Sequence, residues 1–338
     1  MSTPPAAAPP PARRIVAVAL LAPVLAALAL WAFAWPGARI APRDLPLGLA
    51  GPAAATAPVQ RQLQAQDGAF EVHRYADEAA ARDAIEDRTV YGAVVVTAEG
   101  PKLLTASAAS PVAAQLLQHA VAGQAPKGAE VPVTDVVPAP AADPRGSVLG
   151  ASVLPLAIAG VASGVLATLL KLRGPRAALA LVLAAAGVGA VGAALTHSWL
   201  GVLTGNWWAE AGVLGLSTLA VGAAVAGCAA LLGPPGIGVG AFLMVLLGNP
   251  FSGATSAPEL LPQPVGFLGQ LLPPGAGGSL LRSVSYFDGA RATAPALTLA
   301  AWAGLGLLAV LLGALRGRRG AAGAESAVAG AREAAPVG

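Results

Sequence analysis

The feature that most constrains this chain is a series of uninterrupted apolar runs, each close to about 20 residues long. An α-helix rises about 1.5 Å per residue, so about 20 residues cross the roughly 30 Å of hydrocarbon in a bilayer. The first run extends from Ile15 to Trp35. Further helices are expected at about 147–170, 177–196, 210–233, 236–249 and 295–315. The pattern predicts an α-helical polytopic membrane protein with about six transmembrane helices.

Charged residues are unevenly distributed between the apolar runs. Only 11% of the chain is charged and 56% is hydrophobic, which excludes an ordinary water-soluble protein. Of the 37 acidic and basic residues, 21 lie between Pro36 and Arg145, where no run is long enough to span a bilayer. This segment is therefore predicted to form a small α/β domain inserted between the first and second transmembrane helices.

Alternating apolar residues and capping residues indicate the elements of this domain. Strands are expected at Leu45 to Leu49, around Phe70 and Val72, at Tyr91 to Val96, at Lys102 to Ser107 as a hairpin partner, and at Val131 to Val137. Helices are expected after Thr56, after Asp77 up to about Arg88, and after Ser110. Each of these three residues is of a type that caps helix N-termini.

Lysine and arginine near the helix ends predict the orientation in the membrane. Three basic clusters fall on one side if there are six helices: Arg13 and Arg14; Lys171, Arg173 and Arg176; Arg316, Arg318 and Arg319. Cytoplasmic loops are enriched in these residues, so both termini are expected in the cytoplasm of a plasma-membrane protein, with the α/β domain outside. A signal peptide cleaved after Ala32-Phe33-Ala34 is the alternative, but the first run is longer than a usual signal sequence, which favours an uncleaved anchor.

The expected domains follow from these boundaries. They are a disordered cytoplasmic tail (1–14), a first transmembrane helix (15–35), an extracytoplasmic α/β domain (36–145), a five-helix membrane domain (146–316) and a second disordered cytoplasmic tail (317–338).

Motifs that would indicate catalysis or cofactor binding are weak or incomplete. Gly187 to Gly192 matches G-x-G-x-x-G but lies inside an apolar run, which favours close helix packing over a dinucleotide site. No lysine follows glycine, so the chain has no Walker A motif. His73, His119 and His197 are expected to be partly exposed at the surface, and Cys228 has no partner cysteine. We therefore expect no catalytic, cofactor or metal site, no enzyme activity and no nucleic-acid binding.

The most informative segment is the connection within the membrane domain at 249–294. It is too rich in proline and glycine for a full span and too apolar for an ordinary solvated loop. Short re-entrant helices at the outer membrane face would satisfy both facts, and a plain interfacial loop is the alternative. The charged residues expected at the outer mouth are Glu259, Arg282, Asp288 and Arg291.

The layout resembles the type-2 ABC exporter permeases, and within them the phage-infection-protein (YhgE/Pip-like) membrane proteins. The matching features are Leu45-Pro46-Leu47 at the start of the outer domain, Asp77-Glu78-Ala79 leading to Tyr91-Gly92-Ala93-Val94, and the connection from Glu259 to Gly289. The resemblance implies a permease that forms a homodimer or heterodimer and is driven by a separate ATPase subunit. It further implies that the loop carrying Lys171, Arg173 and Arg176 meets that ATPase.

Two functions are therefore expected from different classes. The first is the membrane permease subunit of an ABC-type exporter. The second is a non-transporting membrane receptor or scaffold whose outer domain binds a cell-envelope or secretion partner. The second gains weight because the loop from Leu170 to Arg176 is short for an ATPase contact.

Overall fold

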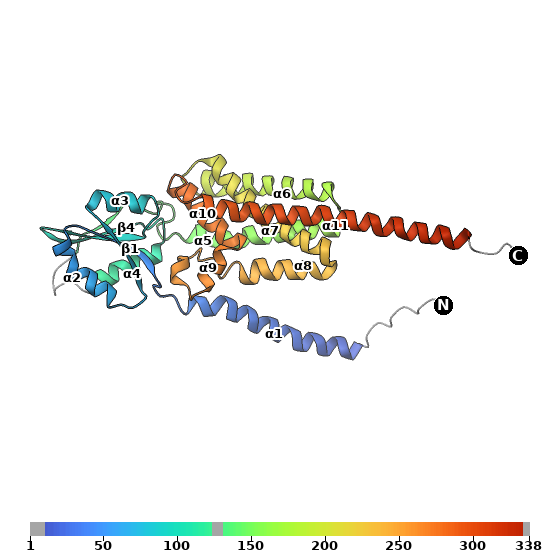
Figure 1. Cartoon of the computed structure of the whole chain (residues 1–338), viewed down its shortest axis with the longest axis horizontal. Helices are drawn as coiled ribbons and strands as arrows, with labels where there is room; N and C mark the ends of the chain where they lie inside the picture. Colours follow the sequence, from blue (N-terminus) through green and yellow to red (C-terminus); the bar gives the residue numbers. More distant parts are fainter. Residues whose placement is uncertain (1–10, 124–130, 334–338) are drawn as a thin grey trace.

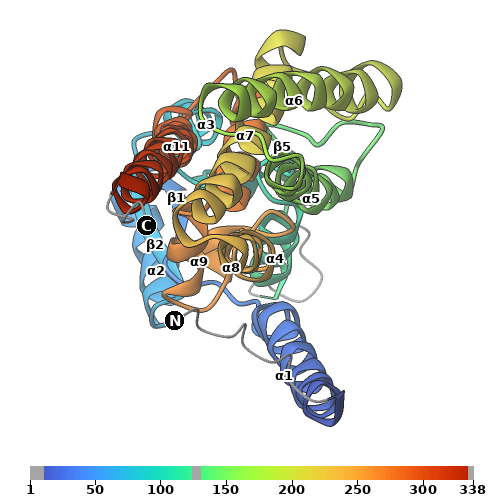
Figure 2. The same ribbon diagram turned by 90° about the vertical axis from the view of Figure 1, so that its right-hand side faces the viewer.

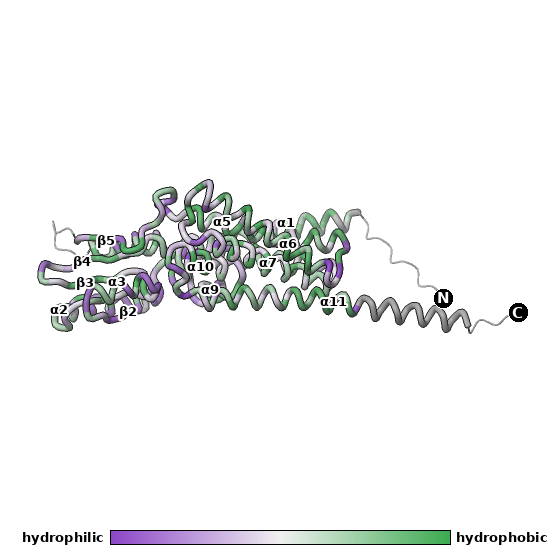
Figure 3. Tube along the Cα trace, turned by 90° about the horizontal axis from the view of Figure 1, so that it is seen from above, coloured by the Kyte–Doolittle hydropathy of each residue, from purple (hydrophilic) through white to green (hydrophobic). Residues whose placement is uncertain are grey.

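The computed structural model describes residues 11–123 and 131–333, which form an α/β domain at one end and a helical bundle at the other (Figure 1). Hydropathy divides the chain in the same way, since apolar residues dominate the bundle and polar residues gather in the domain (Figure 3). The structure is therefore mostly helical, as expected for a polytopic helical membrane protein, with an α/β domain between the first and second long helices.

The domain is built on a five-stranded sheet with the strand order β2-β1-β3-β4-β5. The strands are β1 (Leu45–Ala50), β2 (Phe70–Tyr75), β3 (Gly92–Thr97), β4 (Gly100–Thr105) and β5 (Val133–Asp135). Strand β1 is parallel to β2 and β3, β3 and β4 form an antiparallel hairpin, and β5 is parallel to β4. All five strands lie within the expected regions, although β5 is shorter than predicted.

Helices cover both faces of this sheet, so its central strands are apolar throughout. They are α2 (Ala53–Gln64), α3 (Glu78–Glu86) and α4 (Pro111–Ala122). Helix α3 lies on one face, whereas α2 and α4 lie on the other (Figure 1). The face under α3 buries Ala81 and Ile85, and the opposite face buries Leu47, Leu63 and Leu117.

Two of the three predicted helix caps are confirmed. The side chain of Asp77 accepts a hydrogen bond from the Ala80 amide, and that of Ser110 accepts one from Ala113. Thr56 is not a cap, because α2 begins at Ala53 and the Thr56 hydroxyl donates to the carbonyl of Pro52. A threonine inside a helix satisfies its own hydroxyl in this way, so its side-chain type alone did not locate the helix start.

Five described helices are long and apolar enough to cross a membrane. These spans are Ile15–Gly37 in α1 (Pro11–Gly37), α5 (Ser147–Leu169), Pro175–Trp199 in α6 (Pro175–Ala193) with η1 (Ala194–Trp199), α7 (Trp207–Leu232), and Thr293–Arg316 in α11 (Thr293–Glu333). The remaining helix, expected at 236–249, corresponds to α8 (Pro234–Ala241) and η2 (Phe242–Leu247). Together these form an apolar helix that is shorter than the five spans.

Helix α7 is the centre of the bundle and contacts α5, α6, α8, α10 and α11. Glycines allow its neighbours to approach closely. A Cβ on Gly160 of α5 would lie 2.6 Å from the Cβ of Val221, and a Cβ on Gly189 of α6 would clash with the Ala211 carbonyl. The predicted packing role is confirmed for Gly189 but is wrong for Gly187, beside which there is open space.

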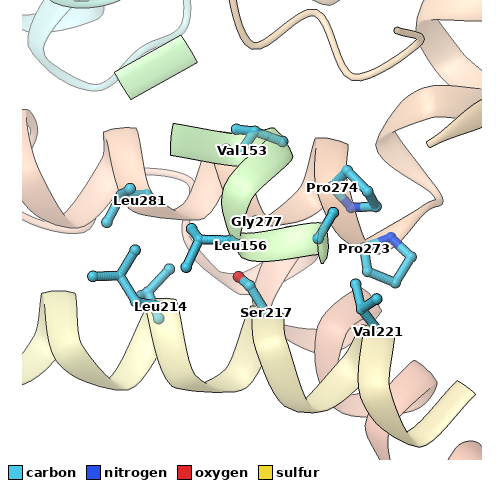
Figure 4. Close-up of a pocket in the computed structure, with 12 residues that line it drawn as sticks. Val153, Leu156, Leu214, Ser217, Val221, Pro273, Pro274, Gly277 and Leu281 are labelled. Carbon is cyan, nitrogen blue, oxygen red and sulfur yellow. The ribbon is translucent and has the colours of Figure 1, made fainter. Parts of the chain in front are cut away.

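Three short helices occupy the connection expected at 249–294: η3 (Pro258–Leu260), α9 (Val265–Gln270) and α10 (Pro273–Tyr286). Helix α10 lies against α5 and α7, where Pro273, Pro274 and Gly277 line a small cavity of about 20 Å³ (Figure 4). The backbone at the start of α10 is therefore enclosed by protein, which is the condition for non-spanning helices at membrane depth.

The same connection also contributes to the α/β domain, beyond the boundary expected at Arg145. Leu260 is fully buried with the leucines of β1 on one face of the sheet, and Phe287 is buried with Ile85 on the other. Backbone hydrogen bonds join Arg43 to Glu259 at 3.0 Å and Ala41 to Leu260 at 3.1 Å. The domain core is thus completed by residues from the membrane half of the chain.

The terminal tails are more helical than expected. Helix α1 begins at Pro11, inside the expected tail 1–14, and α11 continues through 317–333, where a disordered tail was predicted. Alanine and arginine favour helix, and extending an existing helix requires no new nucleus. Residues 1–10 and 334–338 of these tails lie outside the described residues.

Candidate functional site

A cavity of about 460 Å³ lies where the α/β domain meets the bundle. The domain contributes the turn after α3, with Arg88, Thr89 and Tyr91. The connection contributes Glu259, residues of α9 and, from α10, Arg282. The turn before α11 contributes Arg291, and residues at the start of α11 complete the walls.

Arg88 crosses from the domain to the membrane half. It follows the end of α3 with φ +55°, a left-handed conformation that turns the chain toward the bundle. Its Nη1 donates to the Ser279 carbonyl at 3.1 Å and to the Ser283 hydroxyl. The guanidinium also lies 5.4 Å from the centre of the Phe287 ring, within range of a cation–π contact. Burial, reinforced by the charge of Arg282, lowers the pKa of Arg88 to about 10.

Arg282 is the most deeply buried charged group of the cavity, with 5% of its surface exposed. Its Nη2 donates to the carbonyl of Ala254 at 2.9 Å. Helix α10 presents it one turn away from Ser279, on the side facing Arg88. Two guanidinium groups therefore converge on one space, although like charges repel each other.

Among the described residues that line the cavity, Glu259 is the one acidic side chain, and it is bound by Tyr91. The Tyr91 hydroxyl donates to Oε2 of Glu259 at 2.8 Å. Burial, and next the nearby charge of Glu259, raise the pKa of Tyr91 far above its usual value of 10.0. Tyr91 therefore stays protonated and keeps the Glu259 carboxylate directed toward the domain.

Three of the four residues expected at an outer mouth line this cavity: Glu259, Arg282 and Arg291. Arg291 is exposed, and its Nη2 donates to the Thr89 hydroxyl at 3.3 Å. Asp288 does not line the cavity, because it lies exposed in the turn after α10 with φ +48°. Sequence reasoning missed Arg88 and Tyr91, for which no local pattern indicated a contact with α10 or Glu259.

No protein-family model, curated protein or solved structure matches this chain. Its function must therefore be argued from the geometry of its own residues.

The basic loop between α5 and α6 lies at the opposite end of the bundle. Lys171 and Arg173 line a second cavity of about 420 Å³ together with Arg316 of α11. Arg176 is exposed at the start of α6 and does not line this cavity. Two of the three residues predicted for a coupling loop thus share one surface with a third basic residue from the last helix.

One contact between distant side chains was not expected. His197 is partly exposed, as predicted, but its Nδ1 lies 2.8 Å from Oε2 of Glu210, whose side chain is fully buried at the start of α7. The other Glu210 oxygen accepts from the Gly205 amide at 2.8 Å. His119 is exposed, and His73 pairs with Glu71 at 3.3 Å. Within residues 11–123 and 131–333, no group of three metal-ligating side chains could hold an ion.

Proposed function

We propose that this chain is the membrane permease subunit of an ABC-type exporter, driven by a separate ATPase subunit. The main support for this proposal is the order of the helices that follow α7. The short apolar helix Pro234–Leu247 is followed by η3, α9 and α10, which pack beneath the α/β domain before α11 returns. A short span completed by buried re-entrant helices is the layout that the resemblance to type-2 exporters implies.

The proposal places the protein in the plasma membrane with the α/β domain outside and both termini in the cytoplasm. The loop between α5 and α6 lies at the end of the bundle far from the α/β domain (Figure 1), and its Lys171 and Arg173 line one cavity with Arg316 of α11. Basic residues close to helix ends favour the cytoplasmic side. This end is therefore where a cytoplasmic ATPase would bind, and the polar cavity at the other end opens to the outside.

In this function the chain performs no covalent chemistry. The cavity next to the α/β domain would hold the substrate on the side where it leaves the protein, and ATP turnover in the partner subunit would drive the change between conformations. We propose that two permease chains assemble around the pathway, as a homodimer or a heterodimer.

A receptor or scaffold is the second candidate, and one observation favours it. The connection supplies Leu260 and Phe287 to the domain core and binds Arg43 through two carbonyls, at 3.0 Å and 2.8 Å. A domain fixed so firmly to the bundle would present a constant surface to a cell-envelope partner. The short loop at Lys171 also offers little area for an ATPase.

Affinity purification of the tagged full chain in mild detergent distinguishes these functions. The permease function predicts a co-purifying ATPase subunit and measurable ATP turnover. The double substitution Lys171→Glu and Arg173→Glu should abolish the association, whereas Arg145→Glu, at the other end of the bundle, should not. An intact, well-expressed protein without either partner or turnover would favour the receptor or scaffold.

A further inference from the structure

We infer that the cavity between the α/β domain and α10 binds a phosphate group of an anionic ligand. The inference concerns the ligand of this cavity and holds whether the chain transports or only binds. It is carried by three arginines that surround one space, two of them directed there from opposite halves of the chain.

The first argument is the balance of charge. The charged side chains lining the cavity are Arg88, Arg282, Arg291 and Glu259, an excess of two positive charges. None of these four takes part in an ion pair among the residues that the structure describes. Burying an unpaired charge is costly, and proteins ordinarily place an opposite charge beside it. A bound phosphate would supply negative charge there, up to two charges as the inorganic ion and one as the phosphodiester of a lipid headgroup.

The second argument is the supply of free hydrogen-bond donors. A guanidinium has five N–H donors, whereas Arg282 and Arg88 each use one nitrogen toward the surrounding protein. Within the described parts of the chain, Thr105 Oγ1 and Ser285 Oγ are the buried side-chain polar atoms that lack a partner. The remaining guanidinium nitrogens of Arg88 and Arg282 are not among these atoms. They are therefore accessible, and they face the open space of the cavity.

The third argument is chemical fit. Arginine forks match the oxygens of phosphate with paired, charge-assisted hydrogen bonds, which are stronger than neutral ones. A cavity of about 460 Å³ is of the size that holds small ligands. Gln270 and Ser279 line the same wall and are already bonded to each other at 2.6 Å, which holds the wall rigid beside Arg88.

The phosphate could belong to a lipid headgroup or to a small soluble ion. Phe267 of α9 and Leu271, which follows α9, line the cavity and are 62% and 47% exposed, so its rim continues into an apolar surface. An acyl chain could lie along that surface with its headgroup inside. The experiment therefore tests inorganic phosphate and phosphatidylglycerol separately.

The test uses the full chain in nanodiscs made of phosphatidylcholine. Binding of radiolabelled inorganic phosphate is measured by equilibrium dialysis, and retention of added phosphatidylglycerol is measured by native mass spectrometry. Arg291→Gln is the main variant, because Arg291 is exposed and its loss leaves the buried contacts intact. Arg282→Gln is the second, and Arg145→Gln, exposed outside the cavity, is the matched control.

We expect Arg291→Gln and Arg282→Gln each to weaken binding about tenfold or more, because each removes charge-assisted donors. Glu259→Gln should strengthen binding several-fold, because it removes the one repelling charge while an amide oxygen still accepts from Tyr91. Binding of both probes assigns the site to phosphate in general, and retention of phosphatidylglycerol alone assigns it to a headgroup.

Two results would overturn the inference. One is that the wild-type protein binds neither probe. The other is that Arg145→Gln weakens binding as much as Arg291→Gln, since the attraction would then be a general property of the surface. Size-exclusion profiles identify variants that fail to fold. If Arg282→Gln fails to fold, the binding measured for Arg291→Gln and Glu259→Gln tests the inference.

Discussion

The hydroxyl of Tyr91 donates a 2.8 Å hydrogen bond to Glu259, a residue 168 positions further along the chain. Tyr91 precedes the central strand β3, and Glu259 lies in η3 at the end of the bundle next to the α/β domain. The bond therefore joins the sheet of one half to the short helices of the other, close to the three arginines of the cavity.

Replacing Tyr91 by phenylalanine should loosen this junction. The Glu259 carboxylate would lose its donor, and hydrogen bonds to charged groups contribute about 1.5–3 kcal/mol. We expect faster exchange of the Glu259, Leu260 and Leu261 amides in the full chain, and a smaller additional effect when Glu259→Gln is combined with Tyr91→Phe. Tyr75→Phe is the control, and equal effects of Tyr75→Phe and Tyr91→Phe would show that the bond does not hold the junction.

Two glycines of one helix should respond differently to the same substitution. A Cβ at Gly189 meets the Ala211 carbonyl and Gly215 of α7, whereas a Cβ at Gly187 meets nothing within 4 Å. We expect Gly189→Ala to cost about 1–3 kcal/mol through overpacking. Gly187→Ala should leave stability unchanged or raise it slightly, because alanine favours helix over glycine. Thermal denaturation in detergent measures the difference, and equal melting temperatures would contradict the packing of α6 on α7.

Acid should weaken the start of α3. Hydrogen bonds from Lys102 and then Arg82 lower the pKa of the Glu78 carboxyl below its usual value of 4.5. A lowered folded-state pKa means that the stabilisation is present above the unfolded-state pKa and is lost as pH falls through the folded-state pKa. The pair is partly exposed, so solvent screening limits the effect to about 0.2–1 kcal/mol.

The measurement is hydrogen exchange of α3 amides in the full chain, corrected for intrinsic rates, at about pH 6 and about pH 3. Glu78→Gln should make α3 less protected at the higher pH and remove most of the pH dependence. Glu86→Gln, at the other end of the helix, serves as the control. An unchanged pH response in Glu78→Gln would show that another group titrates.

The proposed orientation can be measured by labelling single cysteines in intact cells. In a Cys228→Ser background, Asp67→Cys places a thiol on the α/β domain and Arg173→Cys places one in the loop between α5 and α6, both at exposed positions. A membrane-impermeant maleimide should label the first in intact cells and the second only after permeabilisation. The reverse pattern at either position would refute the orientation.

Much of the fold follows from local properties of the sequence. The length of each apolar run determines whether a helix can span a bilayer, and Asp77 and Ser110 cap the helices that follow them because their side chains reach nearby amides. Such signals involve neighbours in the chain. They therefore located most elements within a few residues and failed at Thr56, where the hydroxyl bonds within the helix instead.

The candidate site was predictable only in part, because its residues come from distant parts of the chain. Glu259, Arg282 and Arg291 stood out because charged residues are rare in an apolar segment. Arg88 lies in a region rich in charges, where nothing distinguishes it from Arg82 before the domain is placed on α10. The His197–Glu210 pair was missed in the same way, since each residue has an ordinary surface interpretation until the fold brings them together.

Helix α1 stands apart from the other helices (Figure 2), and only 6% of the residues in its most apolar stretch are buried. Among its described residues, the contacts lie in its C-terminal turns, where Ala32 is buried and the Trp31 ring lies 6.4 Å from the Phe251 ring. Evolution can therefore exchange one apolar residue for another along Ile15 to Leu30 with little consequence, while the residues of the last turns are constrained by their contacts. Among relatives of this chain, sequence divergence should rise steeply from the C-terminal end of α1 to its N-terminal end.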